Sequence, residues 1–520
     1  MVPTRNTIRQ FCILLLIPIF LYGCGGGESD QSQGGSSKSN FVEIENYISS
    51  EQSALDATDD LTTFNSFIED YNRFAIDYFQ LLTEDEDNVI FSPFSYSNIF
   101  GMLILGGVDT TKDELQNIIS DNVLIDDQLP AAIHSLAQSL LSKNSVHGFH
   151  SSNKLWGHTG YRFHINYLNN LSSYFQTEAT PLNFTILGSD YSEVITQWIS
   201  DNTDPMINPS TLYSTPMDTR LVLANASTLS AQWQVPVNNV ATFDGLFEDL
   251  KGRRHEVPMI NMKGSMNTFQ DDEVFAVELF LASDNLSMVV FMPTGPEWIE
   301  VYGDKFTYLR EDKGESFNDG DEHWVFVKAI GEYYKYTSYG IVSTYMGGTI
   351  YYDFKDEFFE KYQTIINSLS PQQVEVNLPI FSIETNSRRL SPTQENSYYY
   401  AFQEDGADFS GINGLGYLFV SNFKLNAAIS LDEKGLKNSG SSLALFKATP
   451  DEPYDVWESD GTTSWGYFAW CSNDVLSGYQ NTPQPPPSHA RPFIFVVRDN
   501  SSNAILYIGS LVDAGGKIVH

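Results

Sequence analysis

The side chains that most often perform catalysis or bind metals are scattered along this sequence. Its nine histidines and three cysteines form none of the spacings of a zinc site, a metalloprotease helix, a nucleophile elbow or a phosphate-binding loop. A Ser–His–Asp site is defined by geometry rather than by order, and no pattern selects one here. We therefore expect a protein that is not an enzyme and that uses neither a metal nor a cofactor.

Two acidic stretches, Glu84–Asp87 and Asn318–Glu322, contain the oxygen ligands that calcium prefers. Neither has the ligand spacing of a helix–loop–helix calcium site, so solvated turns are the favoured interpretation. The formal charge of −37 argues against binding nucleic acid, or anionic lipid through a basic patch. A basic partner remains compatible with this charge.

An N-terminal apolar run, Phe11–Tyr22, follows two arginines and has the length and flanks of a secretory signal peptide. It ends in Leu21-Tyr22-Gly23-Cys24, which resembles a bacterial lipobox, although Tyr22 is larger than that pattern prefers. We expect residues 1–23 to be a lipoprotein signal peptide, Cys24 to carry the lipid and residues 24–60 to be a flexible tether. An ordinary signal peptide with an incidental cysteine is the alternative.

This interpretation places the protein outside the cytoplasm, lipid-anchored to the cell envelope in the periplasm or at the cell surface, or otherwise secreted. Cys12 would leave with the signal peptide and Cys24 would be acylated, so only Cys471 remains. An intramolecular disulfide framework is therefore excluded, and stability must come from core packing.

The sequence changes character within residues 420–450. Val420–Leu431 is apolar and free of turn residues, as in a strand, whereas the stretch after Gly435 is small and polar from Asn438 to Ser442. Such a run cannot form a core by itself, but it is narrow enough to enter between two existing strands. Taken alone, it is typical of a Gly/Ser linker.

Helices are predicted early in the chain and antiparallel strands late, which is typical of an α+β fold in one large domain. The predicted helices are Leu61–Leu82, a helix capped by Ser92 and opened by Pro93, Thr111–Ile119, Pro130–Leu141, Asn166–Phe175, Ser189–Asp201 and Asp356–Leu369. The predicted strands are Asn88–Phe91, Arg220–Leu229, Val257–Met262, Val274–Leu281, Ser287–Met292, Val374–Ile383, Phe493–Val497 and Ala504–Gly509.

Several segments together resemble the serpin family, in the family's order. They are Asn88–Ser95, Met102–Gly106, Ile195–Thr203, Leu221–Ala226 with Trp233, Val257–Ile260, Leu378–Phe381, Ala407–Ile412 and Arg491–Phe495. The resemblance covers about residues 62–514 and defines a domain over residues 61–520, with insertions near 296–352 and 452–488. It implies the serpin fold, with three β-sheets, eight or nine helices and an exposed reactive loop.

The resemblance also implies how such a protein acts. A serine protease, or alternatively a cysteine protease, cleaves the reactive loop as a substrate, and the freed segment enters the main sheet as a new strand. The attached protease is carried to the far pole and distorted. A fourteen-residue strand rises roughly 45 Å at about 3.3 Å per residue. We expect the inhibitor to act as a monomer.

By position, the resemblance assigns the hinge of this loop to Glu433, Lys434, Gly435, Leu436, Lys437, Asn438, Ser439, Gly440, Ser441 and Ser442. Leu436 stands where the family prefers threonine or serine, Lys437 where glutamate is usual, and Asn438 where alanine is usual. On strand alternation, Leu436, Asn438, Gly440 and Ser442 turn inward and Lys437 faces water. Asn438 therefore needs an interior partner, or it penalises insertion.

The same register places the cleaved bond at Thr449–Pro450. Proline after a cleaved bond makes a poor substrate, so a shift to Lys447–Ala448, or to Phe446, is the alternative. Where the main sheet opens, the family has a histidine at the position of Leu425, beside the strand residue Asn225. We expect Asn225 to bond Ser92 or Ser95 instead, with Trp233 completing this region.

Three functions fit these residues. The first is a lipid-anchored inhibitor of serine proteases. The second is a non-inhibitory binding module of the same fold, favoured by Leu436, Asn438, Pro450 and the aromatic-rich stretch 452–488. The third is an adhesion module that uses its aromatic insertions as a recognition surface.

Overall fold

The structure is a computed structural model, and residues 40–520 belong to the second of its two units. The structure describes residues 40–48, 61–83, 87–120, 128–144, 148–185, 191–203, 207, 218–234, 242–271, 273–282, 285–294, 298–301, 313–319, 322–327, 332–336, 342–345, 357–385, 400–448 and 490–519. The predicted signal peptide, Cys24 and Cys471 lie outside these ranges. Within them, no helix is long and apolar enough to cross a bilayer.

The predicted helices are present, with ends that differ by a few residues at most. The described α-helices are α1 (Leu61–Leu82), α2 (Pro93–Ile104), α3 (Asp109–Ile119), α4 (Gln128–Asn144), α5 (Ile165–Phe175), α6 (Tyr191–Asn202), α9 (Phe358–Ser368) and α11 (Ser410–Asn413). The 3-10 helices η1 (Ile44–Asn46) and η5 (Tyr400–Phe402) accompany them. Every residue of α2 is buried, so it is an interior helix.

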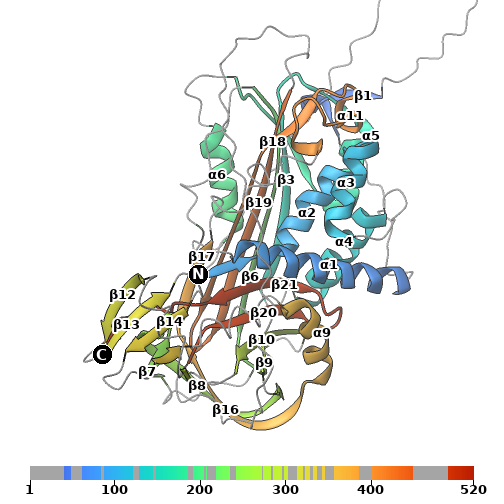
Figure 1. The fold of residues 1–520 in the computed structure, drawn as a ribbon. Helices are drawn as coiled ribbons and strands as arrows, with labels where there is room; N and C mark the ends of the chain where they lie inside the picture. Colours follow the sequence, from blue (N-terminus) through green and yellow to red (C-terminus); the bar gives the residue numbers. More distant parts are fainter. Residues whose placement is uncertain are drawn as a thin grey trace, which may run out of the picture. The chain divides into compact units, whose positions relative to one another are not determined.

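The main sheet has six described strands in the order β17-β18-β19-β6-β3-β5 (Figure 1). Their bounds are β17 (Phe381–Thr385), β18 (Leu418–Leu431), β19 (Gly435–Ala448), β6 (Thr219–Gln232), β3 (Phe149–His158) and β5 (Glu178–Leu182). Among these strands, only the β3–β5 pair is parallel. The segment after Gly435 is therefore a central strand of this sheet.

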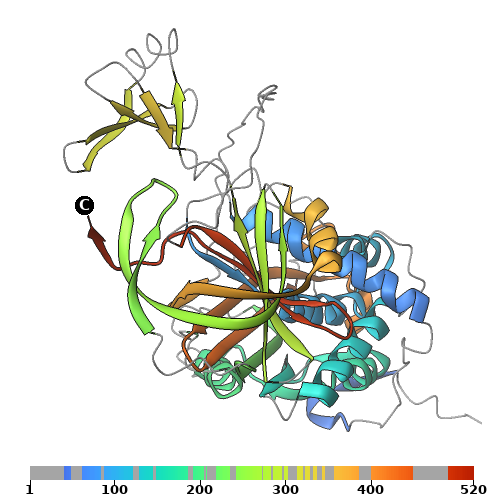
Figure 2. The same ribbon diagram turned by 90° about the horizontal axis from the view of Figure 1, so that it is seen from below.

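The second set of strands forms a nine-stranded arrangement along the path β16-β8-β9-β10-β20-β21-β2, with β7 and β22 also paired to β8. The bounds are β16 (Ser370–Pro379), β8 (Arg254–Gln270), β9 (Val274–Phe280), β10 (Leu286–Pro293), β20 (Phe493–Asp499), β21 (Ile505–Leu511), β2 (Val89–Phe91), β7 (Thr242–Glu248) and β22 (Lys517–Val519). Figure 2 shows β8 as the long curved strand, shared by the two halves of this arrangement. With the main sheet, these halves make the three sheets that the resemblance to the serpin family implies.

One predicted strand is wrong because it joins two strands that belong to different sheets. Val374–Ile383 is divided at Ile380 into β16, which pairs with β8, and β17, which pairs with β18 in the main sheet. Pro379 ends the first strand, because proline has no N–H to continue a ladder. The apolar pattern continues through both strands and conceals this change of sheet.

The predicted insertion near residues 296–352 contains a small sheet of its own. Its strands follow the order β11-β15-β14-β13-β12 and are all antiparallel. They are β11 (Trp298–Val301), β12 (Lys313–Asp319), β13 (Glu322–Val327), β14 (Glu332–Tyr336) and β15 (Val342–Tyr345). The stretch that lacks helical periodicity is thus a set of β-strands.

Part of the predicted tether over residues 24–60 is folded, which corrects that prediction. β1 (Phe41–Glu43) pairs antiparallel with β4 (Arg162–His164), and Ile44 in η1 is buried. The Ile44 side chain lies against the position that a Cβ of Gly157 would occupy. Residues 41–46 are therefore part of the folded domain.

Candidate functional site

The candidate site is β19, which pairs along its whole length with a strand on either side. Toward β18, the register runs from Leu431 opposite Leu436 to Leu418 opposite Ala448. Toward β6, Gly435 lies opposite Gln232 at the first end of the strand. Both ladders are antiparallel, so the backbone of this small and polar segment is bonded on its two edges.

The two faces of β19 meet different surroundings (Figure 1). Leu436, Ala444 and Phe446 join the main core on the face that carries α2, whereas Leu443 and Leu445 belong to a separate cluster on the face that carries α6. Lys437 is exposed and Leu436 is 1% exposed, as strand alternation requires. Burying a strand on both faces costs the least free energy when its polar side chains form hydrogen bonds.

Gly440 of β19 faces Ser92 and Ser95 at the start of α2. A Cβ on this residue would lie 2.9 Å from Ser92 Cβ, 2.9 Å from Ser92 Oγ and 3.0 Å from Ser95 Oγ. Ser92 is fixed because it caps α2, its Oγ accepting from the Ser95 N–H at 3.3 Å. Only glycine therefore fits this point of the inserted strand without displacing the start of α2.

Ser95 is the first member of a row of buried hydroxyl groups that are hydrogen-bonded to one another. Its Oγ is 2.9 Å from Ser227 Oγ on β6, which is 3.3 Å from the phenol oxygen of Tyr507 on β21. Burial raises the pKa of Tyr507, so this phenol stays protonated. These hydroxyls link α2 to both of the large sheets.

The prediction that Asn225 bonds Ser92 or Ser95 is wrong. Its Nδ2 donates to Asn153 Oδ1 at 2.8 Å, Ser151 Oγ at 3.2 Å and the Ser152 carbonyl at 3.4 Å, all on β3. Ser95, one of the two predicted partners, instead bonds Ser227. Asn225 is held by its neighbouring strand rather than by α2, because β3 presents three acceptors beside it.

Four residues on neighbouring strands, including Asn225, lie opposite one another in a row across the main sheet. Leu425 lies opposite Ser442, which lies opposite Asn225, which lies opposite Asn153. Leu425 is 3% exposed and separated from Asn225 by the inserted strand. Among the described residues, the buried Ser442 hydroxyl has no hydrogen-bond partner. A polar side chain at the position of Leu425 would offer Ser442 the partner that it lacks.

Asn438 is the least satisfied residue of β19. It is 1% exposed, and within the described part of the chain neither its Nδ2 nor its Oδ1 has a hydrogen-bond partner. An unsatisfied buried polar group costs about 1–3 kcal/mol. The penalty that the sequence predicts for Asn438 is thus present in the inserted strand.

Two residues outside the predicted hinge support the turn before β19. Asp432 Oδ1 accepts from the Lys434 N–H at 2.8 Å and the Gly435 N–H at 3.1 Å. Trp233 donates from Nε1 to the Asp432 carbonyl at 2.9 Å, and its own N–H donates to the Lys434 carbonyl at 3.0 Å. An aspartate side chain often bonds the backbone N–H two residues later and so forms a turn. This preference is the sequence signal that identifies Asp432.

Gly435, where β19 begins, is also explained by its surroundings. A Cβ there would lie 2.0 Å from the Ala231 carbonyl oxygen and 2.7 Å from the Gln232 Cα. Both neighbours are backbone atoms of β6, which cannot move aside as a flexible side chain does. Glycine is thus required where β19 begins beside β6.

The candidate bait residues lie at the far end of the strand. Phe446 is fully buried and packs edge-to-face on Phe409 at 4.9 Å. Lys447 is partly exposed and forms an ion pair with Asp218 at 3.0 Å, and Ala448 is the last residue of β19. The predicted bond Thr449–Pro450 lies outside the described residues.

Comparisons with known proteins identify a family with this fold. The family model described as serpin (serine protease inhibitor) matches residues 69–313 and 351–514. Serpin B10 of Mus musculus is 21% identical over 467 residues, covering 84% of this chain and 97% of the relative. An uncharacterized serpin-like protein of Methanosarcina acetivorans is 21% identical over 445 residues, covering 85% and 84%.

Solved structures share the fold at low identity. Cleaved Serpin 42Da superposes with a TM-score of 0.62 at 18% identity, covering 87% of this chain and 100% of that one. The thermophilic serpin tengpin in its latent state gives 0.60 at 18% identity, covering 86% and 98%. Because the family model spans most of the sequence and the fold agrees, this chain belongs to the serpin family.

Proposed function

We propose that this protein inhibits serine proteases through cleavage and insertion of its reactive loop. The observation that carries the proposal is that residues 435–448 complete both hydrogen-bond ladders between β6 and β18. Gly435 and Gly440 stand at the two points where any side chain would meet β6 or α2. A segment with these properties can lie as a central strand of the sheet, and in the proposed mechanism it lies outside the sheet before cleavage.

In the proposed active state, residues 435–448 lie outside the sheet and are open to a protease. The structure holds them inside the sheet although the chain is uncut, which corresponds to the state after insertion. Asn438 and Ser442 favour the outer state, because water satisfies side-chain atoms that have no described partner in the sheet. Burial of Leu443, Leu445 and Phe446 favours the inserted state.

Protease mixing tests the inhibitory mechanism. We expect a trypsin-like protease to form a complex that survives boiling in detergent if Lys447 is the bait, and a chymotrypsin-like protease to do so if Phe446 is. Sequencing the released C-terminal fragment identifies the cleaved bond, including Thr449–Pro450. Cleavage by every protease without a stable complex would contradict inhibition.

The second candidate is a non-inhibitory binding or adhesion module of the same fold. The observation in its favour is the buried Asn438, whose amide lacks a partner among the described residues and therefore slows insertion after a cut. A slow insertion releases the protease before it is trapped. Cleavage at the bait with no stable complex is the result expected of this alternative.

For the location of the protein, we propose export and attachment to the cell envelope through a lipid on Cys24, with a monomeric domain carried on a short tether. In detergent phase separation, we expect the full chain expressed in a bacterium to enter the detergent phase and Cys24→Ser to remain in the aqueous phase. Cys12→Ser, within the apolar run, is the matched control. If Cys24→Ser also partitions into detergent, the lipid assignment is wrong.

A further inference from the structure

A groove of about 770 Å³ lies beside the hairpin of β7 and β8 and is lined mainly by apolar and aromatic side chains. Its lining includes Phe243, Leu246, Met259, Phe275, Met292 and Val374. Phe243 is 43% exposed and Leu246 is 38% exposed, so part of this apolar lining is open. Apolar grooves that are open to solvent mark binding sites in many proteins.

The chain itself enters this groove at Ala490, which is one of the lining residues. The Ala490 N–H donates to the Leu246 carbonyl at 3.0 Å, and its carbonyl accepts from the Glu248 N–H at 2.9 Å. This is a parallel bridge opposite Phe247 on β7. Ala490 therefore lies on the edge of β7 that faces away from β8.

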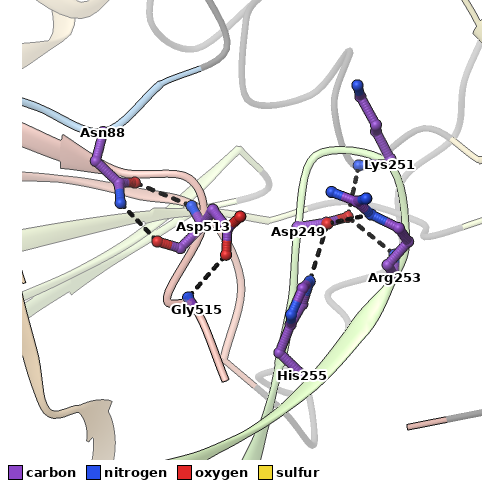
Figure 3. Close-up of polar contacts among 7 residues, drawn as sticks. All are labelled: Asn88, Asp249, Lys251, Arg253, His255, Asp513 and Gly515. Carbon is purple, nitrogen blue, oxygen red and sulfur yellow. Dashed lines mark hydrogen bonds and ion pairs between the residues drawn. The ribbon is translucent and has the colours of Figure 1, made fainter. Parts of the chain in front are cut away.

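The hairpin that carries this edge is firmly held. Asp249, at the turn after β7, accepts from the backbone N–H groups of Lys251 and Arg253, each at 2.9 Å (Figure 3). Its Oδ2 also lies 2.6 Å from Arg253 Nε and 3.0 Å from His255 Nε2. These contacts on one buried carboxylate fix the turn, so β7 is a rigid template for an added segment.

The residues immediately before Ala490 have a composition suited to such a groove. Pro483 and the run Pro485–Pro487 precede Ser488. Consecutive prolines favour the extended polyproline II conformation and have no N–H to donate to a ladder. Segments of this kind dock in aromatic-lined grooves elsewhere, because little conformational entropy is lost on binding.

We propose that residues 483–488 of this chain occupy the groove, with Ser488 extending the parallel pairing and the prolines packing on Phe243 and Leu246. Continuing the register of Ala490 by two residues brings the Ser488 N–H to the Asp244 carbonyl and the Ser488 carbonyl to the Leu246 N–H. The ladder ends there, since Pro486, the next residue that would face β7, has no N–H to donate. At about 3.1 Å per residue, residues 483–487 extend roughly 15 Å along the groove.

The groove takes this segment ahead of a separate partner because of connectivity. The segment is joined to Ala490, which is already bonded to β7, so its effective concentration at the groove is in the millimolar range or above. A free proline-rich peptide would have to exceed that concentration to displace it. The proposal is independent of protease inhibition, since it concerns a part of the chain outside β19.

Hydrogen exchange across residues 242–248 of the full chain tests this docking. We expect the Leu246 amide to exchange about tenfold faster when Pro485, Pro486 and Pro487 are all replaced by serine, because the segment then leaves the groove. The groove-side variant Phe243→Ser should give the same increase, and combining the two should add nothing further. Phe243 is exposed, so its loss leaves the fold intact.

Matched controls separate docking from general loosening of the chain. Replacing Pro450 and Pro453 by serine changes prolines in the same connector but distant in sequence from Ala490, and Leu415→Ser removes a side chain that is 50% exposed elsewhere. Both should leave exchange at Leu246 unchanged. A synthetic peptide of residues 481–488, added at millimolar concentration, should restore protection to the triple serine variant.

Two results would overturn the proposal. One is unchanged exchange at Leu246 in both the triple serine variant and Phe243→Ser. The other is protection that rises with protein concentration, because a second copy of the chain would then be the occupant. Protease complex formation by the triple serine variant is expected to be unaffected, which keeps this test separate from that of the inhibitory function.

Discussion

Replacing Gly440 with aspartate is expected to turn the proposed inhibitor into a substrate. The new Cβ would lie within 3.0 Å of Ser92 and Ser95, and the carboxylate would be buried between β19 and α2. An uncompensated buried charge costs about 3–5 kcal/mol. The start of the α2 dipole offsets at most about 2 kcal/mol of this, and it does not relieve the overlap with Ser92.

The readout is the fraction of protease held in a detergent-stable complex, measured beside the fraction of inhibitor that is merely cut. For Gly440→Asp, we expect the complex to fall at least about tenfold while cleavage continues, because a cost above about 1.4 kcal/mol slows insertion by that factor. Lys437→Asp is the control, since it places the same charge on an exposed position of the same strand. Equal complex formation by Gly440→Asp and the parent would show that residue 440 does not enter the sheet.

Replacing Asn438 with alanine is expected to have the opposite effect. Alanine removes two polar atoms that lack described partners in the sheet, each worth about 1–3 kcal/mol. The loss of side-chain volume costs part of this gain. A net stabilisation of about 1.4 kcal/mol makes insertion about tenfold more favourable, so more protease is trapped per cleavage event.

Thermal melting of the loop-cleaved protein gives a readout that needs no target protease. We expect the cleaved Asn438→Ala protein to melt above the cleaved parent, and both to melt above a cleaved Gly440→Asp protein. Lys437→Ala, at the adjacent exposed position, should leave the melting temperature unchanged. A cleaved Asn438→Ala protein that melts below its parent would show that the amide finds partners on insertion, contrary to the contacts described above.

The parts of the fold that follow local rules are predictable from the sequence. Ser92 and Pro93 mark the start of α2 because capping and proline preference act within one turn. β6 is predictable because apolar residues fill most of Arg220–Leu229. Strand alternation alone also places Lys437 in solvent and Leu436 in the core, and both positions are confirmed.

The incorrect predictions arise where a long-range neighbour decides the structure. β3 has polar residues from Ser151 to Lys154, so no apolar alternation reveals a strand there. Because β3 is not predicted, the acceptors that hold Asn225 are hidden from sequence reasoning, and the start of α2 becomes the expected partner. The contact between Trp233 and the turn at Asp432 is equally hard to predict, because the two residues are distant in the sequence.

The cluster on the far side of the main sheet has a mechanical consequence. Ile195 and Ile199 of α6 pack in one cluster with Leu443 and Leu445, and Trp198 of the same helix meets Trp156 edge-on at 5.5 Å. A strand cannot thread beneath a helix that is already packed on the sheet. In the proposed mechanism, helix α6 must therefore lift and return when the strand passes, so the strength of its packing would set an upper limit on the rate at which a protease is trapped.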